Sequence, residues 1–408
     1  MKPYRTLPLL LCLVWCALAT VPAPGFADTN GAVTPTRPAN DANTRKGFEH
    51  FYNLEYDKAI KEFEAAQQAH PNDPFAVNHL LSAVIFKELY RIGALDTEAY
   101  AADSFLNKKL AAPLDPAVGT RVEQLTNQAY ALEQAQLDKN ANDVNALYAR
   151  GATRAMHSTY IGLAEHAWLT ALRGAVAARH DNERVLELDP NYVDAKVVVG
   201  THLYIVGSLS WPVKVAASVV GLSGSKQKGL DDLRQATGSP HVEVATDARI
   251  VLALFLRREQ KYNEALQVVN TLQNEYTHNF LMATEYAHLL NAAGHGQDAI
   301  TAYRKVLAGC RANTYNQCRI EIPAYGLGEA LRGQKQYAEA VEAYELAADT
   351  GTDPDFKQKA TLAAGETYDL MQKRDSAVEK YKAVIAENSA SSSAELARRY
   401  MKQAYRTP

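Results

Sequence analysis

A recurring spacing of small and aromatic residues constrains the fold of this chain more than any other feature. Gly47 is followed after 12, 16, 19 and 24 residues by Ala59, Phe63, Ala66 and Pro71. The same intervals lead from Gly328 to Ala340, Tyr344 and Ala347. Shorter copies are Gly365 with Ala377 and Tyr381, Ala287 with Ala299 and Tyr303, and Ala253 with Ala265. Since Ala253 and Ala287 lie 34 residues apart, the spacing indicates a structural repeat of that length.

The residue types in this pattern suit pairs of antiparallel helices. Small residues let two helices approach closely, and an aromatic ring fills the gap to the next pair. One pair cannot bury its apolar face alone, so pairs stack. The pattern resembles the tetratricopeptide repeat. That resemblance implies an all-α fold, a right-handed superhelix of antiparallel helix pairs, with a protein or peptide ligand in its concave groove.

The repeat is regular only near the two ends of the chain. In the middle, Gly151 and Gly200 are 49 residues apart, and Gly200 and Ala253 are 53 apart, which predicts longer, irregular helices. We therefore expect a repeat unit over 43–72, a divergent section over 73–246, a repeat array over 247–386, and a capping helix with a tail over 387–408.

The stretch GLSGSKQKG, residues 221–229, has the composition of a phosphate-binding loop. Its lysines do not follow the glycines at the spacing of a nucleotide-binding loop, and no strand precedes it. We interpret it as a turn between helices, after which Gly229, Leu233 and Ala236 take the small, bulky and small positions of a second helix. The stretch also weakly resembles the eukaryotic tetratricopeptide family linked to inclusion-body clearance.

The beginning of the sequence has the order of a secretory signal. Lys2 and Arg5 precede an apolar segment, and small residues stand at Gly25 and Ala27. We expect a signal peptide over 1–27, cleavage after Ala27, a disordered leader over 28–42, and a periplasmic or extracellular protein. A lipoprotein signal ending at Cys16 is the alternative.

Cys310 and Cys318 are the cysteines that would remain after cleavage. Ala287 and Gly328 are 41 residues apart, seven more than one repeat, so the additional residues form a long turn that both cysteines flank. Export supplies an oxidising compartment. The sequence therefore predicts a disulfide between Cys310 and Cys318.

Catalytic, cofactor and metal sites are not expected from the sequence. His157, His166 and His180 are 9 and 14 residues apart, which is not the spacing of ligands on one helix. The formal net charge of −3 gives no reason to expect nucleic acid as a partner. Residues 197–222 are apolar but interrupted near their middle, which favours buried helices over a membrane contact.

These observations favour a non-catalytic protein–protein interaction scaffold in the cell envelope. An envelope protein that binds a small molecule or lipid for a transporter, with 197–222 lining its cavity, is the alternative, and an enzyme is a third. The spacing of the repeat indicates, to within a residue or two, which residues of each first helix face the groove. The candidates are Asn53, Tyr286, Asn291, Tyr325 and Tyr368.

Overall fold

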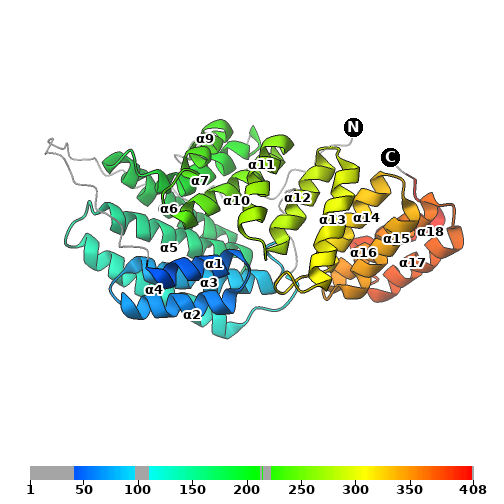
Figure 1. Ribbon diagram of the computed structural model, residues 1–408, viewed down its shortest axis with the longest axis horizontal. Coiled ribbons are helices and arrows are strands. Elements are labelled where there is room, and N and C mark those ends of the chain that lie inside the picture. The colour runs from blue at the N-terminus through cyan, green and yellow to red at the C-terminus, as the bar shows by residue number, and fades with distance from the viewer. Residues whose placement is uncertain (1–40, 97–109, 212–213, 215–221, 407–408) are drawn as a thin grey trace. The chain divides into compact units, whose positions relative to one another are not determined.

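The computed structural model describes residues 41–96, 110–211, 214 and 222–406. Within these residues the chain forms 17 α-helices and one 3₁₀-helix and no strand (Figure 1). The helices are α1 (Ala42–Tyr52), α2 (Tyr56–Ala69), α3 (Pro74–Arg91), α4 (Pro116–Leu137), α5 (Val144–Leu163), α6 (Trp168–Leu188), η4 (Val193–Ala195), α7 (Lys196–Ser208), α9 (Lys226–Ala236), α10 (Val242–Arg258), α11 (Tyr262–Glu275), α12 (Phe280–Ala292), α13 (Gly296–Arg311), α14 (Glu321–Gly333), α15 (Tyr337–Thr350), α16 (Pro354–Leu370), α17 (Arg374–Glu387) and α18 (Ser392–Lys402).

Consecutive helices pack against one another as antiparallel pairs, which confirms the all-α, tetratricopeptide-like fold for the described residues. The regular pairs use the expected residues. The buried ring of Tyr344 lies where a Cβ on Gly328 would be 2.6 Å away, and Tyr381 takes the same place beside Gly365 at 2.7 Å. Only glycine lets these helices cross over a buried tyrosine at such short range. The expected longer helices of the middle are also present, because α4, α5 and α6 span 22, 20 and 21 residues.

The turn inside each regular pair has one repeated geometry. Seven residues after the small residue of each repeat, the backbone adopts a left-handed conformation, with φ between 56° and 85° at five positions: Leu54, Gln260, Gly294, Lys335 and Gln372. The next residue donates its N–H to a carbonyl five residues earlier, at 2.9 Å in every case. This arrangement satisfies the carbonyls at the end of the first helix and reverses the chain.

The chain divides into two compact units that are not simple halves of the sequence. The first unit comprises Met1–Phe48, Asp57–Leu89 and Leu114–Phe255, and the second comprises Glu49–Tyr56, Tyr90–Pro113 and Leu256–Pro408. The turn between α1 and α2 therefore belongs to the same unit as the array that begins near α11.

Side-chain contacts inside the second unit explain this assignment. The Asn279 side-chain amide donates to the carbonyl of Tyr52 at 2.7 Å, and the Tyr52 and Tyr276 rings lie 5.0 Å apart. The Asn316 amide donates to Glu55 at 2.8 Å. In a simple stacked array each pair contacts only its neighbours, so these contacts, more than 220 residues apart in sequence, are an addition to the repeat plan.

Candidate functional site

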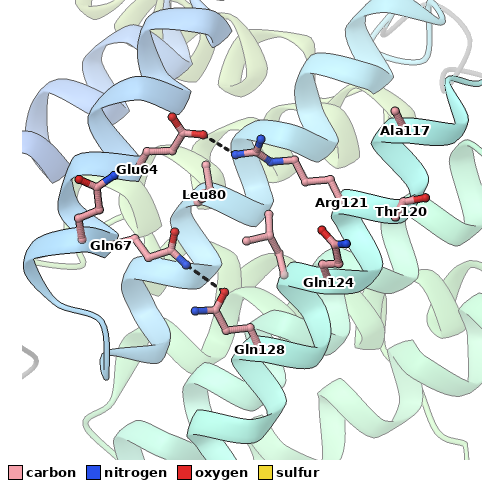
Figure 2. A pocket seen from close by; sticks show the side chains of 10 residues that line it. Glu64, Gln67, Leu80, Ala117, Thr120, Arg121, Gln124 and Gln128 are labelled. Carbon is pink, nitrogen blue, oxygen red and sulfur yellow. Dashed lines mark hydrogen bonds and ion pairs between the residues drawn. The ribbon is translucent and has the colours of Figure 1, made fainter.

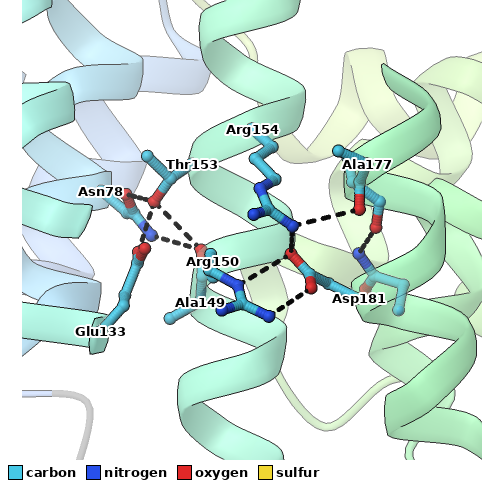
Figure 3. A network of polar contacts seen from close by, with 10 residues as sticks. Asn78, Glu133, Ala149, Arg150, Thr153, Arg154, Ala177 and Asp181 are labelled. Carbon is cyan, nitrogen blue, oxygen red and sulfur yellow. Dashed lines mark hydrogen bonds and ion pairs between the residues drawn. The ribbon is translucent and has the colours of Figure 1, made fainter. Parts of the chain in front are cut away.

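A network of buried polar side chains joins four helices of the first unit (Figure 3). Thr153 on α5 lies at its centre, with its hydroxyl oxygen 2.7 Å from Asn78 Oδ1 on α3 and 2.5 Å from Glu133 Oε1 on α4. The Asn78 side-chain NH₂ group donates to the carbonyl of Ala149 at 3.0 Å, so the side-chain oxygen of Asn78 remains as an acceptor for the Thr153 hydroxyl. Thr153 has one hydroxyl proton and faces the oxygens of both Asn78 and Glu133, so a protonated Glu133 would allow both contacts to be hydrogen bonds.

The environment of Glu133 favours that protonated form. Its side chain is fully buried, and its Oε2 atom has no hydrogen-bond partner. Burial raises the pKa of the carboxyl to about 7, against the opposing effects of the Thr153 hydroxyl and the Arg150 guanidinium. Glu133 is therefore a buried acid that titrates near neutral pH.

The same network continues as an ion-pair cluster between α5 and α6. Asp181 is buried and accepts from Arg150 at 2.7 and 3.1 Å and from Arg154. Nearby, the buried Asn182 amide occupies the space that a Cβ on Gly151 would take. The ion pairs of Asp181 are made within the fold, so they support the packing of α5 against α6.

A shallow pocket of about 400 Å³ lies on the surface of the first unit between α2, α3 and α4 (Figure 2). Two side-chain bridges cross it: Glu64 pairs with Arg121, and the Gln67 and Gln128 amides hydrogen-bond at 3.0 Å. A ligand would have to break these bridges to enter. The pocket holds polar groups that already satisfy one another, and it has no titratable pair suited to acid–base chemistry.

The first helices of the second unit carry a row of charged side chains. We call it the charged row: Arg257 on α10, Glu285 on α12, Glu329 and Arg332 on α14, and Glu366 and Asp369 on α16. Ion pairs connect neighbouring helices along it. Arg257 contacts Glu285 at 2.9 Å, and Arg332 contacts Glu366 at 2.9 Å while also holding Glu329 on its own helix.

The charges at the centre of the row are partly desolvated without being enclosed, whereas Asp369 and the Arg257–Glu285 pair are more deeply buried. The side chains of Arg332, Glu366 and Glu329 are 19%, 13% and 34% exposed. Burial raises the pKa of Glu366, and Arg332 opposes that rise. Burial acts to lower the pKa of Arg332, but Tyr344 and the two glutamates outweigh it and raise the pKa. A half-buried row of this kind binds polar or charged groups more strongly than a fully solvated surface does.

The sequence identified the helices of this surface but not its residues. Five of the row's members stand one or four residues after the small residue of a repeat, at Arg257, Glu329, Arg332, Glu366 and Asp369. The groove candidates from sequence are all half-buried, and among them only Asn291 stands four residues after a small repeat residue, as Arg332 and Asp369 do. Tyr325 packs against Tyr344 and Phe356 with Lys359 over its ring, and the Asn53 side chain accepts from the backbone of His278.

The other residues considered from sequence have ordinary structural partners. His157 contacts Glu123 at 2.6 Å. Ser225 caps the start of α9, and Gly229, Leu233 and Ala236 are buried, as expected of a turn followed by a second helix. Among residues 41–96, 110–211, 214 and 222–406, no group of three or more His, Cys, Asp or Glu side chains is arranged to hold a metal ion. Within those same ranges no helix has both the length and the apolarity to cross a membrane.

Cys310 and Cys318 are joined by a disulfide in the structure, with Cα atoms 5.6 Å apart. The bridged loop carries Asn316, which contacts Glu55, and Gln317, whose carbonyl accepts from the Tyr90 hydroxyl. The disulfide thus closes the loop that contacts the α1–α2 turn. The expected signal peptide with its cleavage site and Cys16, most of the expected leader, and part of the apolar stretch 197–222 lie outside the described residues.

Comparisons with known proteins give fold likeness only. No family model matches the chain. No curated protein matches it either. Among solved structures, the chain is similar to Pseudomonas aeruginosa pilF, at 17% identity and a TM-score of 0.37 over 61% of this chain and 98% of that one. It is similar to yeast Tom70 at 13% identity and a TM-score of 0.40, over 88% and 87% of the two chains.

A tetratricopeptide repeat protein of Parabacteroides merdae is similar at 12% identity and a TM-score of 0.33, over 79% of this chain and 97% of that one. At these TM-scores the superpositions are loose. The assignment of a tetratricopeptide-like helical-repeat fold therefore rests on the chain's own helix pairs and turns.

Proposed function

We propose that this protein is a non-catalytic scaffold that holds an extended segment of a partner protein along the first-helix face of its second unit. The charged row is the observation that carries the proposal. It places charges of both signs on consecutive first helices and connects them across the helices, and the half-buried Glu329, Arg332 and Glu366 at its centre are where an extended chain would contact several charges at once. Helical-repeat arrays offer such extended faces to chain segments.

We further propose that the protein acts in the cell envelope after export. The signal-like sequence of residues 1–27 and the pair Cys310–Cys318 support this location, because both suit an oxidising compartment. The alternative, a lipid- or small-molecule-binding protein, depends on residues 197–222, of which 212–213 and 215–221 lie outside the described residues.

Two charge-neutral double variants test the scaffold. Arg332→Ala with Glu366→Ala removes the centre of the charged row. Arg304→Ala with Glu339→Ala removes a matched ion pair between second helices, whose side chains are 49% and 53% exposed. The experiment is crosslinked capture from an envelope extract, with recovered proteins quantified by mass spectrometry.

We expect the row variant to lose at least tenfold of the recovery of a specific partner, whereas the control variant retains it. Equal recovery by both variants, with helical content unchanged, would mean that this face is not the working surface. Turnover of a substrate by the purified chain would overturn the scaffold proposal altogether.

A further inference from the structure

The residues that follow α18 return over the charged row. At Gln403 the backbone leaves the helix in an extended conformation, with φ −140° and ψ 117°. Two residues later the backbone N–H of Tyr405 donates to Asp369 Oδ2 at 2.8 Å. The Tyr405 ring packs edge-on against Tyr400, with centroids 5.2 Å apart. Residues 403–406, which we call the tail, are thus docked on α16.

The Tyr405 side chain lies within electrostatic range of the centre of the row. Burial raises the pKa of its phenol, the Glu366 carboxylate adds to that rise, and the Arg332 guanidinium opposes it. The phenol in turn is one of the groups that raise the pKa of Arg332. Glu366 and Arg332 are therefore close enough to act on the ring, and they belong to the same ion pair that defines the row.

The Asp369 carboxylate is held in position to accept a hydrogen bond from a backbone N–H. Its side chain is 1% exposed, and Arg374 holds both of its oxygens, at 2.8 and 3.0 Å. The second Nη atom of Arg374 donates to the carbonyls of Tyr400 and Met401, at 2.6 and 2.8 Å. One arginine therefore fixes both the receiving carboxylate and the end of α18 from which the tail departs.

The contacts of the tail have the form of peptide recognition. A buried carboxylate accepts a backbone N–H, and an aromatic side chain next to it enters a half-buried charged surface. Extended segments bind by this combination of main-chain hydrogen bonds and side-chain anchors. A tail whose only task was to cover α18 would have no need of Glu366 and Arg332, which lie on α16 and α14.

We propose that the tail is an internal occupant of the partner site, and that the partner displaces it with an extended segment carrying a tyrosine. This proposal rests on the proposed scaffold function and specifies its ligand. A tethered occupant competes at an effective concentration of roughly millimolar for a short link. A segment offered by a second protein must therefore outcompete Tyr405, which sets a threshold for binding.

The probe is a labelled synthetic peptide with the sequence of residues 402–408, KQAYRTP. It is titrated into the full chain and into the Tyr405→Ala variant, with thermal unfolding used to confirm that the variant is folded. Because the variant's own tail has lost its anchor, we expect it to bind the peptide at least tenfold more tightly than the wild type. A peptide with alanine in place of its tyrosine should lose at least tenfold of its affinity for the variant.

A second measurement uses only the wild-type chain. Amide hydrogen exchange at Tyr405 should be slow in the free protein, and saturating peptide should accelerate it at least tenfold as the bond to Asp369 opens. Equal peptide affinity of wild type and variant, no binding by the variant, or free-protein exchange at the rate of an unstructured peptide would each overturn the proposal. Such results would leave the scaffold untouched, since partner capture tests it separately.

Discussion

The two compact units use charged side chains in opposite ways. In the first unit, Asp181 and Glu133 lie inside the packing of α3 to α6 and find their partners there. In the second unit, Glu366 and Arg332 pair across first helices and stay partly exposed, with a short tail against them. The same residue types thus serve cohesion in the first unit and, in the function that we propose, recognition in the second. The central carboxylates differ in burial, since Asp181 is 6% exposed and Glu366 is 13% exposed, while the arginines of both clusters are partly exposed.

Removing a carboxylate from the first unit should give the largest loss of stability. Asp181→Ala leaves Arg150 and Arg154 without the group that both of them contact. Loss of one partner from a buried ion pair costs roughly 3–5 kcal/mol. Denaturant unfolding measures the change. Glu339→Ala, which breaks an exposed pair in the second unit, is the control and should cost less than about 1 kcal/mol. Similar losses for the two variants would remove the contrast between the units.

Stability should also depend on pH through Glu133. Its pKa of about 7 in the folded state lies above the ordinary value of 4.5, so protonation favours folding. This contribution is complete below pH 4.5 and is lost as the pH rises through 7. The full loss is about 3 kcal/mol, from the difference between the two pKa values.

The Glu133→Gln variant isolates this effect because an amide does not titrate. The charged and titratable groups near Glu133 are Arg150, Arg154, Tyr130 and Asp181, and they remain in the variant. Free energies of unfolding measured between pH 5 and 8 should fall for the wild type relative to the variant. Parallel pH profiles would show that Glu133 is ionised in the folded protein throughout.

The loop of the second unit should depend on its disulfide. Closing a loop between residues separated by 8 positions stabilises the fold by roughly 2–3 kcal/mol. Reduction should lower stability by that amount and loosen the contact of Asn316 with Glu55. Thiol labelling of unreduced, denatured protein, followed by peptide mapping, should find no label on Cys310 or Cys318. Labels on both would show that the chain carries free thiols.

The smallest expected effect concerns the left-handed turns, all five of which lie in the second unit. Lys335 has φ 61°, which a residue with a Cβ adopts at a cost, so Lys335→Gly should stabilise the chain by up to about 1 kcal/mol. Gly294→Ala should do the reverse, because its φ is 85° and nothing crowds the site. Thermal unfolding of the two variants gives the comparison. If the unfolding temperatures of the two variants shifted in the same direction, the repeated turn geometry would be contradicted.

The sequence predicted the elements of the second unit well because local rules produce them. Gly328 and Tyr344, or Gly365 and Tyr381, are residues of one helix pair, and their spacing is visible in a short stretch of chain. The charged row was missed although it has a spacing of its own. Arg332 and Asp369 each stand four residues after a repeat glycine, but the apolar pattern used to find the repeats gives no weight to charged positions.

No local sequence pattern predicts the polar network of the first unit or the long-range contacts of the second. Asn78, Glu133 and Thr153 meet from three helices, and nothing in the sequence around any one of them indicates the other two. The contact of Asn279 with Tyr52 joins residues 227 positions apart. Such contacts depend on how the pairs stack, which a spacing rule for one pair does not determine.

We propose that the charged row of the second unit recognises an extended segment of the kind that its own tail represents. The most direct test measures the affinity of the labelled KQAYRTP peptide for two variants of the Tyr405→Ala chain. One adds Arg332→Ala and Glu366→Ala, and the other adds Arg304→Ala and Glu339→Ala. We expect the first change to weaken the affinity for the peptide at least tenfold and the second to alter that affinity less than twofold. Equal affinities, or a larger loss in the second variant, would contradict it.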